Sequence, residues 1–162
     1  MTAPLRDARH RIGFRPARPD DFDYCARLYF AAMEPTIRAL GLDEALHLAG
    51  FRARWDAAEV RIIVRDGADI GWLQSTMRER ELFLGQLLVD APSRGRGIGT
   101  EVMNSLIAEA ARAGLAVTLG VVKTNPALRL YERLGFRITH ADDRKFYMRR
   151  DTAPAAANSP RP

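Results

Sequence analysis

Hydrophobic and polar positions alternate along this chain with two different periodicities. Short apolar runs that alternate with polar residues, or that are rich in β-branched residues, predict strands. Apolar residues spaced three and four apart predict amphipathic helices. The strand pattern occurs over residues 11–16, 60–65, 68–76, 82–89, 116–122, 136–139 and 145–148, where strands are therefore expected. By the second, helices are expected over residues 20–33, 43–55, 100–113 and 125–134.

Proline and glycine mark the boundaries of these elements. Pro35 is expected to interrupt the first helix, because a proline inside a helix removes a backbone hydrogen bond. Asp66-Gly67 predicts a tight hairpin between two strands. Gly114 and Gly135 are expected to end the last two helices. The second helix is expected to pack through its apolar members, Leu46, Leu48, Phe51 and Trp55.

The resulting order of elements is β-α-α-β-β-β-α-β-α-β-β. It predicts an α/β (α+β) protein, with a single mixed sheet that carries helices on both faces. Residues 11–150 are expected to form this one domain, after a flexible N-terminal arm over 1–10. Residues 151–162 are rich in alanine and proline, have no periodicity, and are expected to be a disordered tail.

A glycine-rich stretch links the apolar strand 82–89 to the third helix. It places glycines at positions 95, 97 and 99, where the absence of β-carbons lets a ligand approach the backbone amides. A helix that starts there directs unpaired N–H groups and its positive dipole end at the loop, as in phosphate sites. Arg94 and Arg96 add positive charge. A basic surface turn is the alternative interpretation.

The spacing separates this loop from two common nucleotide motifs. It lacks the Lys-Ser/Thr ending of a P-loop and the acidic residue of a dinucleotide fingerprint. Residues 94–99 instead read Arg-x-x-Gly-x-Gly, after a Leu-Leu-Val strand and an Asp-x-Pro turn. In that form the loop resembles the acyl-CoA pyrophosphate loop of the GNAT superfamily of N-acetyltransferases. The predicted order of elements is also that of the GNAT fold, and the resemblance spans roughly residues 12–149.

A second signature lies at residues 125–136. It contains an asparagine, then an alanine, then a Tyr-Glu-x-x-Gly-Phe ending, as the fourth helix of the family commonly does. The resemblance implies that Asn125 bonds the pantetheine arm and that Tyr131 protonates the departing thiolate. Without the resemblance, Tyr131 would be interpreted as an aromatic residue of the core.

The resemblance implies acetyl-CoA as cosubstrate and direct attack of an amine on its carbonyl, with a backbone N–H near Leu88 at the oxyanion. The loop amides, with Arg94, would hold the pyrophosphate, and Arg96 would reach the 3′-phosphate or solvent. The implied binding residues are Leu87, Leu88, Val89, Arg94, Gly95, Arg96, Gly97, Ile98, Gly99, Thr100 and Asn125.

A general base is harder to assign. Family members often carry a glutamate on the fourth or fifth strand, but the matching positions here are near Phe83 and at Gly120. Glu81, on the same strand face as Phe83, and Glu34, after the first helix, are the candidates. Each also reads as a surface acid. A water chain or an amine of low pKa would remove the need for either.

The charge is unevenly distributed. The chain has a net charge of +5, yet residues 20–60 hold eight acidic and four basic residues, a net of −4, and the remainder therefore carries +9. One part suits a cofactor with several phosphates and the other a cationic amine, although solvated helix faces explain the same asymmetry. Arginine is scattered without a dense basic block, which argues against nucleic-acid binding.

Other functional classes have little support. Cys25, the only cysteine, falls among apolar helix residues and is expected to be a packing residue in a reducing cytoplasm. His10, His47 and His140 lack the spacing of metal ligands, so no metal is expected. No apolar run approaches a membrane span, and the N-terminus lacks a signal-peptide core.

The sequence therefore predicts an enzyme, a cytoplasmic N-acetyltransferase that uses acetyl-CoA to acetylate a primary amine. The acceptor would be a small molecule or a peptide or protein N-terminus, and the protein a monomer or homodimer. The alternative is an acyl-CoA-binding regulatory module without turnover, and a nucleic-acid-associated protein is a third hypothesis.

Overall fold

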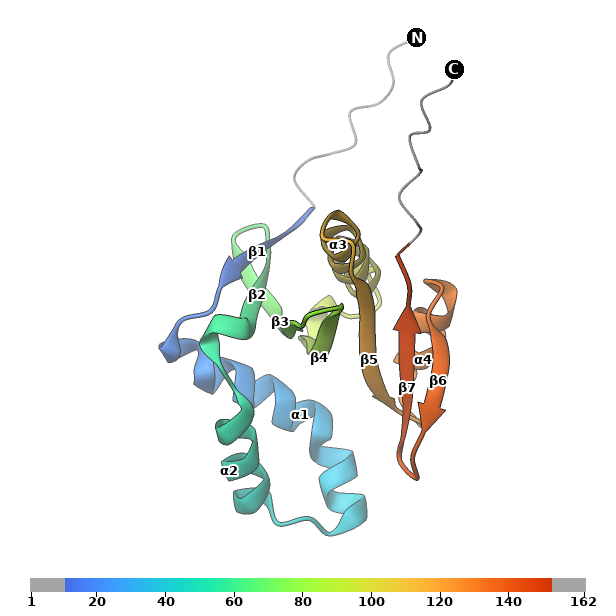
Figure 1. Cartoon of the computed structure of the whole chain (residues 1–162). Coiled ribbons are helices and arrows are strands. Elements are labelled where there is room, and N and C mark those ends of the chain that lie inside the picture. Colours follow the sequence, from blue (N-terminus) through green and yellow to red (C-terminus); the bar gives the residue numbers. More distant parts are fainter. Residues whose placement is uncertain (1–10, 153–162) are drawn as a thin grey trace, which may run out of the picture. The chain divides into compact units, whose positions relative to one another are not determined.

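The computed structural model describes residues 11–152 and has its elements in the predicted order (Figure 1). The predicted arm at 1–10 and residues 153–162 of the predicted tail lie outside the described residues. The strands are β1 (Ile12–Pro16), β2 (Val60–Arg65), β3 (Ala68–Met77), β4 (Glu81–Val89), β5 (Ala116–Val122), β6 (Arg137–Ala141) and β7 (Lys145–Arg150). The helices are α1 (Phe22–Leu40), α2 (Glu44–Arg54), α3 (Ile98–Arg112) and α4 (Ala127–Arg133), with 3-10 turns η2 (Pro19–Asp21), η3 (Ala57–Glu59) and η4 (Ala91–Ser93).

The sheet is mixed, as predicted. Its seven strands follow the order β1-β2-β3-β4-β5-β7-β6. β4 and β5 are parallel and are joined through α3, whereas β2 and β3 form an antiparallel hairpin. Asp66 and Gly67, with φ of 50° and 77°, make the tight turn of that hairpin, because both central residues of such a turn need positive φ.

The chain forms two compact units. The first holds the residues up to Gln74 together with Gln86–Gly99, and the second holds Ser75–Gly85 together with the residues from Thr100 onward. β4 contributes its beginning to the second unit and its end to the first. The single domain over 11–150 stays a prediction.

The first unit has an aromatic core beneath α1 and α2. Cys25, Ala26 and Tyr29 of α1 and Phe51 of α2 pack in one buried cluster with three residues of the hairpin strands, Val60, Ile62 and Trp72. The two helices therefore cover the face of β2 and β3 that presents these side chains. Cys25 is fully buried, and its burial raises the pKa of the thiol to about 12, which suits the predicted packing role.

The prediction that Pro35 interrupts the first helix is wrong. α1 continues through Pro35 to Leu40 and ends at Gly41, whose φ is 58°. A proline in a helix interior costs about 3 kcal/mol relative to alanine, yet the flanking turns keep their bonds. Glu34 pairs with Arg38 across Pro35 at 2.6 Å, and the amides of Gly41 and Leu42 close the last turn.

The predicted apolar face of α2 is only partly correct. Phe51 is buried at 4% exposure and Trp55 is half-buried, but Leu46 is 76% exposed and Leu48 is 38% exposed. Residues 47, 51 and 55 share one side of the helix at i, i+4 spacing, and Leu46 lies nearly opposite to them. Apolar content alone therefore overestimated how much of α2 is buried.

The second unit is built on the parallel pair of β4 and β5. Their pairing runs from Glu81–Ala116 to Leu84–Leu119, and Gly85 is the first residue of β4 without a recorded pair in β5. β5 pairs on its other side with β7, which forms a hairpin with β6 (Figure 1). The part of α3 in this unit buries Val102, Met103, Leu106 and Ala110, which have the three- and four-residue spacing of an amphipathic helix.

One glycine in the first unit is required by a close backbone approach. A β-carbon at Gly71 of β3 would collide with the carbonyl oxygen of Leu88 and lie 3.1 Å from the Cα of Val89. Both obstacles are backbone atoms of β4, so neither can move aside cheaply. The end of β4 therefore lies against β3 at a distance that only glycine permits.

We expect Gly71→Ala to lower the free energy of unfolding by about 2–3 kcal/mol, as overpacking in a core does. Urea denaturation followed by circular dichroism would measure it. Gly13→Ala in β1 is the matched control, because no heavy atom lies within 4 Å of a β-carbon there. An equal loss of stability in both variants would contradict the close approach as the cause.

Candidate active site

The loop between β4 and α3 is held at its start by Asp90. The backbone amide of Asp90 donates to the carbonyl of Ile70 at 2.8 Å, which ties the end of β4 to β3. The carboxylate of Asp90 accepts from the amide of Ser93 at 3.1 Å and caps η4. The Asp-x-Pro turn predicted from the sequence therefore holds the first residues of the loop in place against β3.

The following residues form an open cradle of donors. Gly95 and Gly97 have φ of 71° and 76°, and no heavy atom lies within 4 Å of a β-carbon at either. Over residues 11–152 the amides of 95, 96 and 97 have no hydrogen-bond acceptor. Arg94 donates from Nε to the carbonyl of Val89 at 2.9 Å, which leaves its terminal nitrogens available, and Arg96 is exposed.

These residues fit an anion with several negative charges, because unpaired amides and two arginines follow one another along a loop whose glycines have open space around them. Ile98 is 2% exposed and anchors the start of α3 in the protein. Gly99 has no positive φ, and Gly99 and Thr100 are half-buried. The left-handed geometry is thus confined to Gly95 and Gly97.

Leu87, Leu88 and Val89, predicted to bind the pantetheine arm, form the end of β4 and are half-buried. The carbonyl of Leu88 points at Gly71 of β3. Because successive residues of a strand direct their backbone groups to opposite sides, those of Leu87 and Val89 point away from β3. None of the recorded pairs between β4 and β5 involves these three residues.

Tyr131 lies on α4 in the second unit. Its side chain is 8% exposed, its ring packs edge-on against Phe136 at 5.9 Å, and burial raises the pKa of its phenol. The hydroxyl makes no hydrogen bond to any residue that the structure describes. Gly135, with φ of 86°, lets the amide of Phe136 return to the carbonyl of Tyr131 at 3.0 Å. The Tyr-Glu-x-x-Gly-Phe ending is therefore a helix stop that fixes the position of Tyr131.

Asn125 precedes the same helix. Its side-chain oxygen accepts from the amide of Ala127 at 2.9 Å, as a capping side chain does. Pro126 follows as the residue before the first helical position. Since the oxygen is engaged, the side-chain NH₂ group of Asn125 is the part that remains for a ligand.

Both candidate bases are held in ion pairs. Glu81 accepts from Arg78 at 3.1 Å, and its other oxygen lies 3.7 Å from Arg149. Glu34 is bound to Arg38 at 2.6 Å and its side chain is 64% exposed. Both carboxylates are therefore already engaged by arginine side chains.

Within the described part of the chain, no group of three or more His, Cys, Asp or Glu side chains could hold a metal ion. His47 is hydrogen-bonded to the hydroxyl of Tyr29 at 3.1 Å, and the ring of His140 stacks on Tyr147 at 4.4 Å. His10 lies outside the described residues. None of the helices in this described part is long and apolar enough to cross a membrane.

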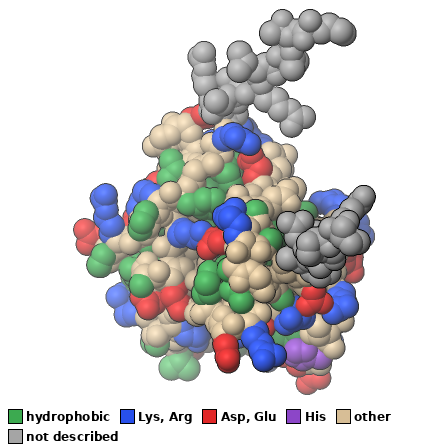
Figure 2. Space-filling model, turned by 45° about the horizontal axis from the view of Figure 1, so that its top comes forward, with side chains coloured by type: hydrophobic (Ala, Val, Ile, Leu, Met, Phe, Trp, Pro, Cys, Tyr) green, Lys and Arg blue, Asp and Glu red, His purple; other side chains and the backbone are tan. Residues whose placement is uncertain are grey.

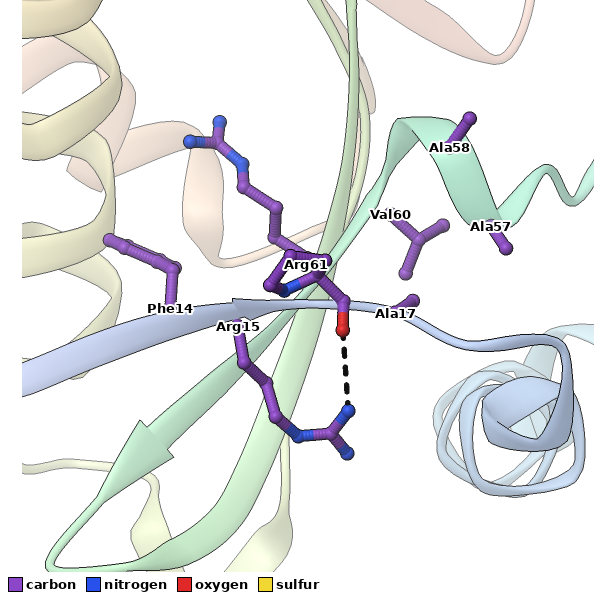
Figure 3. A pocket seen from close by; sticks show the side chains of 8 residues that line it. Phe14, Arg15, Ala17, Ala57, Ala58, Val60 and Arg61 are labelled. Atoms are coloured by element: carbon purple, nitrogen blue, oxygen red, sulfur yellow. Dashed lines mark hydrogen bonds between the residues drawn. The ribbon is translucent and has the colours of Figure 1, made fainter.

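A hollow of about 340 Å³ lies between β1 and the η3–β2 segment (Figure 3). Two arginines line it, but both are engaged. Arg15 donates to Pro16, Asp21 and Asp69, and Arg61 lies over the ring of Phe14 at 5.4 Å (Figure 3). The other lining side chains are small and apolar. This hollow therefore offers little polar chemistry for a ligand.

The basic residues are dispersed. Figure 2 shows Lys and Arg side chains mixed with Asp and Glu over one face, without a continuous basic block. Several arginines are paired with acids, among them Arg15 with Asp21 and Asp69.

Sequence reasoning did not single out Tyr24, on α1. Its hydroxyl is buried without a hydrogen-bond partner among the residues described. Burial, with the nearby charges of Asp90 and Asp69, raises the pKa of this phenol to about 12. Tyr24 thus stays neutral beside the start of the glycine loop. No sequence motif marks Tyr24, because its nearness to Asp90 arises only when the chain folds.

The comparisons with known proteins agree with the fold and identify the family. The model of the Acetyltransferase (GNAT) family matches residues 25–136. An uncharacterised N-acetyltransferase of Methanocaldococcus jannaschii is 28% identical over 139 residues, which cover 75% of this chain and 59% of that protein. The chain thus spans less than two thirds of the length of this relative.

Solved structures show the same fold. Ard1 of Thermoplasma volcanium has a TM-score of 0.65 at 18% identity, covering 88% of this chain and 98% of that one. The PaiA N-acetyltransferase of Thermoplasma acidophilum, solved in complex with coenzyme A, has a TM-score of 0.69 at 14% identity, covering 87% and 99%. The predicted fold, a mixed sheet with helices on both faces, is confirmed.

Proposed function

Because this chain belongs to the Acetyltransferase (GNAT) family, we propose that it transfers an acetyl group from acetyl-CoA to a primary amine. The observation that carries the proposal is the open cradle at Gly95 and Gly97, with its unpaired amides and two flanking arginines. This cradle suits the pyrophosphate of a CoA thioester. The protein would act in the cytoplasm, in keeping with its single, buried, free cysteine.

In this proposal the end of β4 binds the pantetheine arm as an added strand would. The backbone groups of Leu87 and the N–H of Val89 are the best placed, because the Leu88 carbonyl faces Gly71 of β3 and the Val89 carbonyl already accepts from Arg94. The NH₂ group of Asn125 donates to a pantetheine carbonyl. Arg94 and the amides from Gly95 to Thr100 hold the pyrophosphate, and Arg96 reaches the 3′-phosphate.

The reaction would proceed by direct attack. The lone pair of the neutral amine forms a C–N bond to the acetyl carbonyl, and the N–H of Leu87 stabilises the oxyanion that develops. The C–S bond then breaks, and the phenol of Tyr131 gives its proton to the thiolate. Much of the rate would come from holding the two substrates in line.

The amine's own proton would pass to solvent. The ion pairs of Glu81 and Glu34 argue against either as the direct acceptor. We therefore expect Glu81→Gln and Glu34→Gln to retain kcat/KM within about threefold, since neither removes a transition-state contact. In a series of amines of different basicity, the rising limb of the kcat/KM–pH profile should follow the pKa of the amine.

Steady-state release of free thiol from acetyl-CoA, measured between pH 6 and 10, would supply these profiles. A limb that stays at one pH for every amine and disappears in Glu81→Gln would identify that carboxylate as the base instead.

The second candidate function is an acyl-CoA-binding regulatory module without turnover. The ion-paired state of both acids favours it, because the chain then offers no evident base. Calorimetric titration with acetyl-CoA, followed by a screen of an amine library for thiol release, separates the two functions. Binding without turnover of any amine would support the regulatory module, and absence of binding would refute both.

A further inference from the structure

The lysine side chains of this protein are gathered at one place in the second unit. Lysine and arginine together number 25, and only two of these residues are lysines, Lys123 and Lys145. The amide of Lys123 donates to the carbonyl of Arg144 at 3.0 Å, and Lys145 pairs with Val122 across β5 and β7 (Figure 1). An arginine stays protonated in proteins, so these lysines are the only side chains of the protein that offer a primary amine.

Of the two lysines, Lys145 has the uncommitted ammonium. The Nζ of Lys123 lies 5.3 Å from the centre of the Phe146 ring. Lys145 is exposed, and its side chain makes no hydrogen bond or ion pair to any residue between 11 and 152. The backbone amide of Lys145 donates to the carboxylate of Asp142 at 2.7 Å. Lys145 is thus a free amine on a backbone position that is fixed.

The stem of Lys145 lies over Gly120 of β5. A β-carbon at Gly120 would be 3.8 Å from the Cδ of Lys145, and the ring of Tyr147 lies beside it at 3.4 Å. A larger residue at position 120 would compete with the lysine stem for this space. The recorded pairs between β4 and β5 end with Leu84 and Leu119, so Gly120 is the next residue of β5. The amine of Lys145 therefore lies close to the point where the parallel pairing stops.

The proposed binding mode of acetyl-CoA directs its thioester toward this point. The pyrophosphate is proposed to lie beyond the end of β4, so the thiol end of the arm points back along β4 toward its pairing with β5. Asn125 is proposed to hold an amide of the arm, and its own amide donates to the carbonyl of Val122 at 2.8 Å. Val122 is the register partner of Lys145. The flexible four-carbon stem of a lysine can span the roughly 5 Å between neighbouring strands.

We propose that Lys145 is a self-acetylation site of this protein. The proposal rests on the acetyl transfer proposed above and extends it to a side chain of the enzyme. The ammonium gives one proton to solvent, and the lone pair of Nζ forms a C–N bond to the acetyl carbonyl of bound acetyl-CoA. The C–S bond breaks, and the thiolate takes the proton of the Tyr131 phenol. The new amide nitrogen loses its second proton, which restores Tyr131, and the products are Nε-acetyl-Lys145 and CoA.

The test is incubation of the protein with acetyl-CoA and no other amine, followed by mass spectrometry of the intact chain and of its peptides. We expect one acetyl group on Lys145, added at a rate per molecule that does not change with protein concentration. Lys145→Arg should abolish this label and leave the Kd for acetyl-CoA, measured by calorimetry, unchanged. Lys123→Arg is the matched control, and it should be labelled at Lys145 as the unmodified protein is.

Dissolved acetyl-CoA also acetylates exposed amines without any enzyme, and Gly97→Glu separates that reaction from self-acetylation. With acetyl-CoA near the Kd of the unmodified protein, we expect this variant to label Lys145 at least ~10-fold more slowly, because it should bind the thioester much more weakly. An unchanged rate in Gly97→Glu, or equal labelling of Lys123 and Lys145, would overturn the proposal. A rate per molecule that rises with protein concentration would overturn it too, because the amine would then come from another copy.

Thiol release with added amines is measured in parallel, so the two proposals fail separately. Normal acetyl-CoA binding and turnover of an added amine, with no label on Lys145, would overturn self-acetylation alone. Absence of acetyl-CoA binding would instead refute the acetyl-transfer proposal, on which self-acetylation rests.

Discussion

Gly97→Glu is expected to weaken acetyl-CoA binding by at least ~100-fold, which corresponds to about 2.7 kcal/mol. The side chain would extend from the centre of the cradle, where open space surrounds the glycine, and would place a negative charge at the proposed pyrophosphate position. The φ of 76° adds backbone strain, because a residue with a β-carbon disfavours this region. Isothermal titration calorimetry measures the effect directly.

Two further variants separate charge from strain. Gly97→Ala has the same strain without the charge, and we expect it to weaken binding by no more than about thirtyfold, since left-handed strain costs roughly 1–2 kcal/mol. Gly114→Glu places the same charge and a similar strain at the end of α3, where φ is 69° and the space is also open. Its acetyl-CoA affinity should be unchanged. Equal losses in Gly97→Glu and Gly114→Glu would show that the loop does not hold the cofactor.

Tyr131→Phe is expected to lower kcat about 100-fold, the usual contribution of a positioned general acid, and to leave the Kd for acetyl-CoA unchanged. The variant should fold normally, because the hydroxyl has no hydrogen-bond partner among the described residues and the ring keeps its contact with Phe136. Thiol release under saturating substrates measures kcat, and calorimetry measures Kd.

The pH dependence adds a second readout for Tyr131. Burial raises the pKa of the phenol above its ordinary value near 10, so the proton-bearing form persists throughout the neutral and mildly alkaline range. Titration of Tyr131 should therefore cause no fall in kcat between pH 7 and 9.

Tyr147→Phe is the control for Tyr131→Phe. It removes a hydroxyl that donates to Asp142 at 2.8 Å, and it should leave kcat unchanged. A Tyr131→Phe variant that keeps kcat within threefold of the unmodified protein would show that Tyr131 is a packing aromatic, which was the alternative interpretation of its sequence position.

The order of elements and the loop could be predicted because their causes lie close together in the sequence. The turn at Asp66-Gly67, the apolar face of α3 and the capping side chain of Asn125 each depend on residues within a few positions. The glycines at 95 and 97 likewise take up the left-handed conformation for which glycine is suited. Local spacing was sufficient for all of these.

Other features depended on partners that are distant in sequence. The exposure of Leu46 was decided by which side of α2 meets Tyr29 and Phe30 of α1. Glu81 was a candidate base on sequence grounds because its partner Arg149 lies far along the chain, and the sequence does not show that the two meet.

The sequence by itself therefore determined the secondary-structure order, the GNAT resemblance and the left-handed glycines of the loop, since periodicity and glycine spacing are local properties. Only the tertiary structure decided that Leu88 closes against Gly71, that Glu81 lies beside Arg149, and that Phe30, Glu44 and Leu48 share one hollow. The physical reason is that burial, ion pairing and close packing are set by which segments meet in space, and a single sequence does not specify those meetings residue by residue.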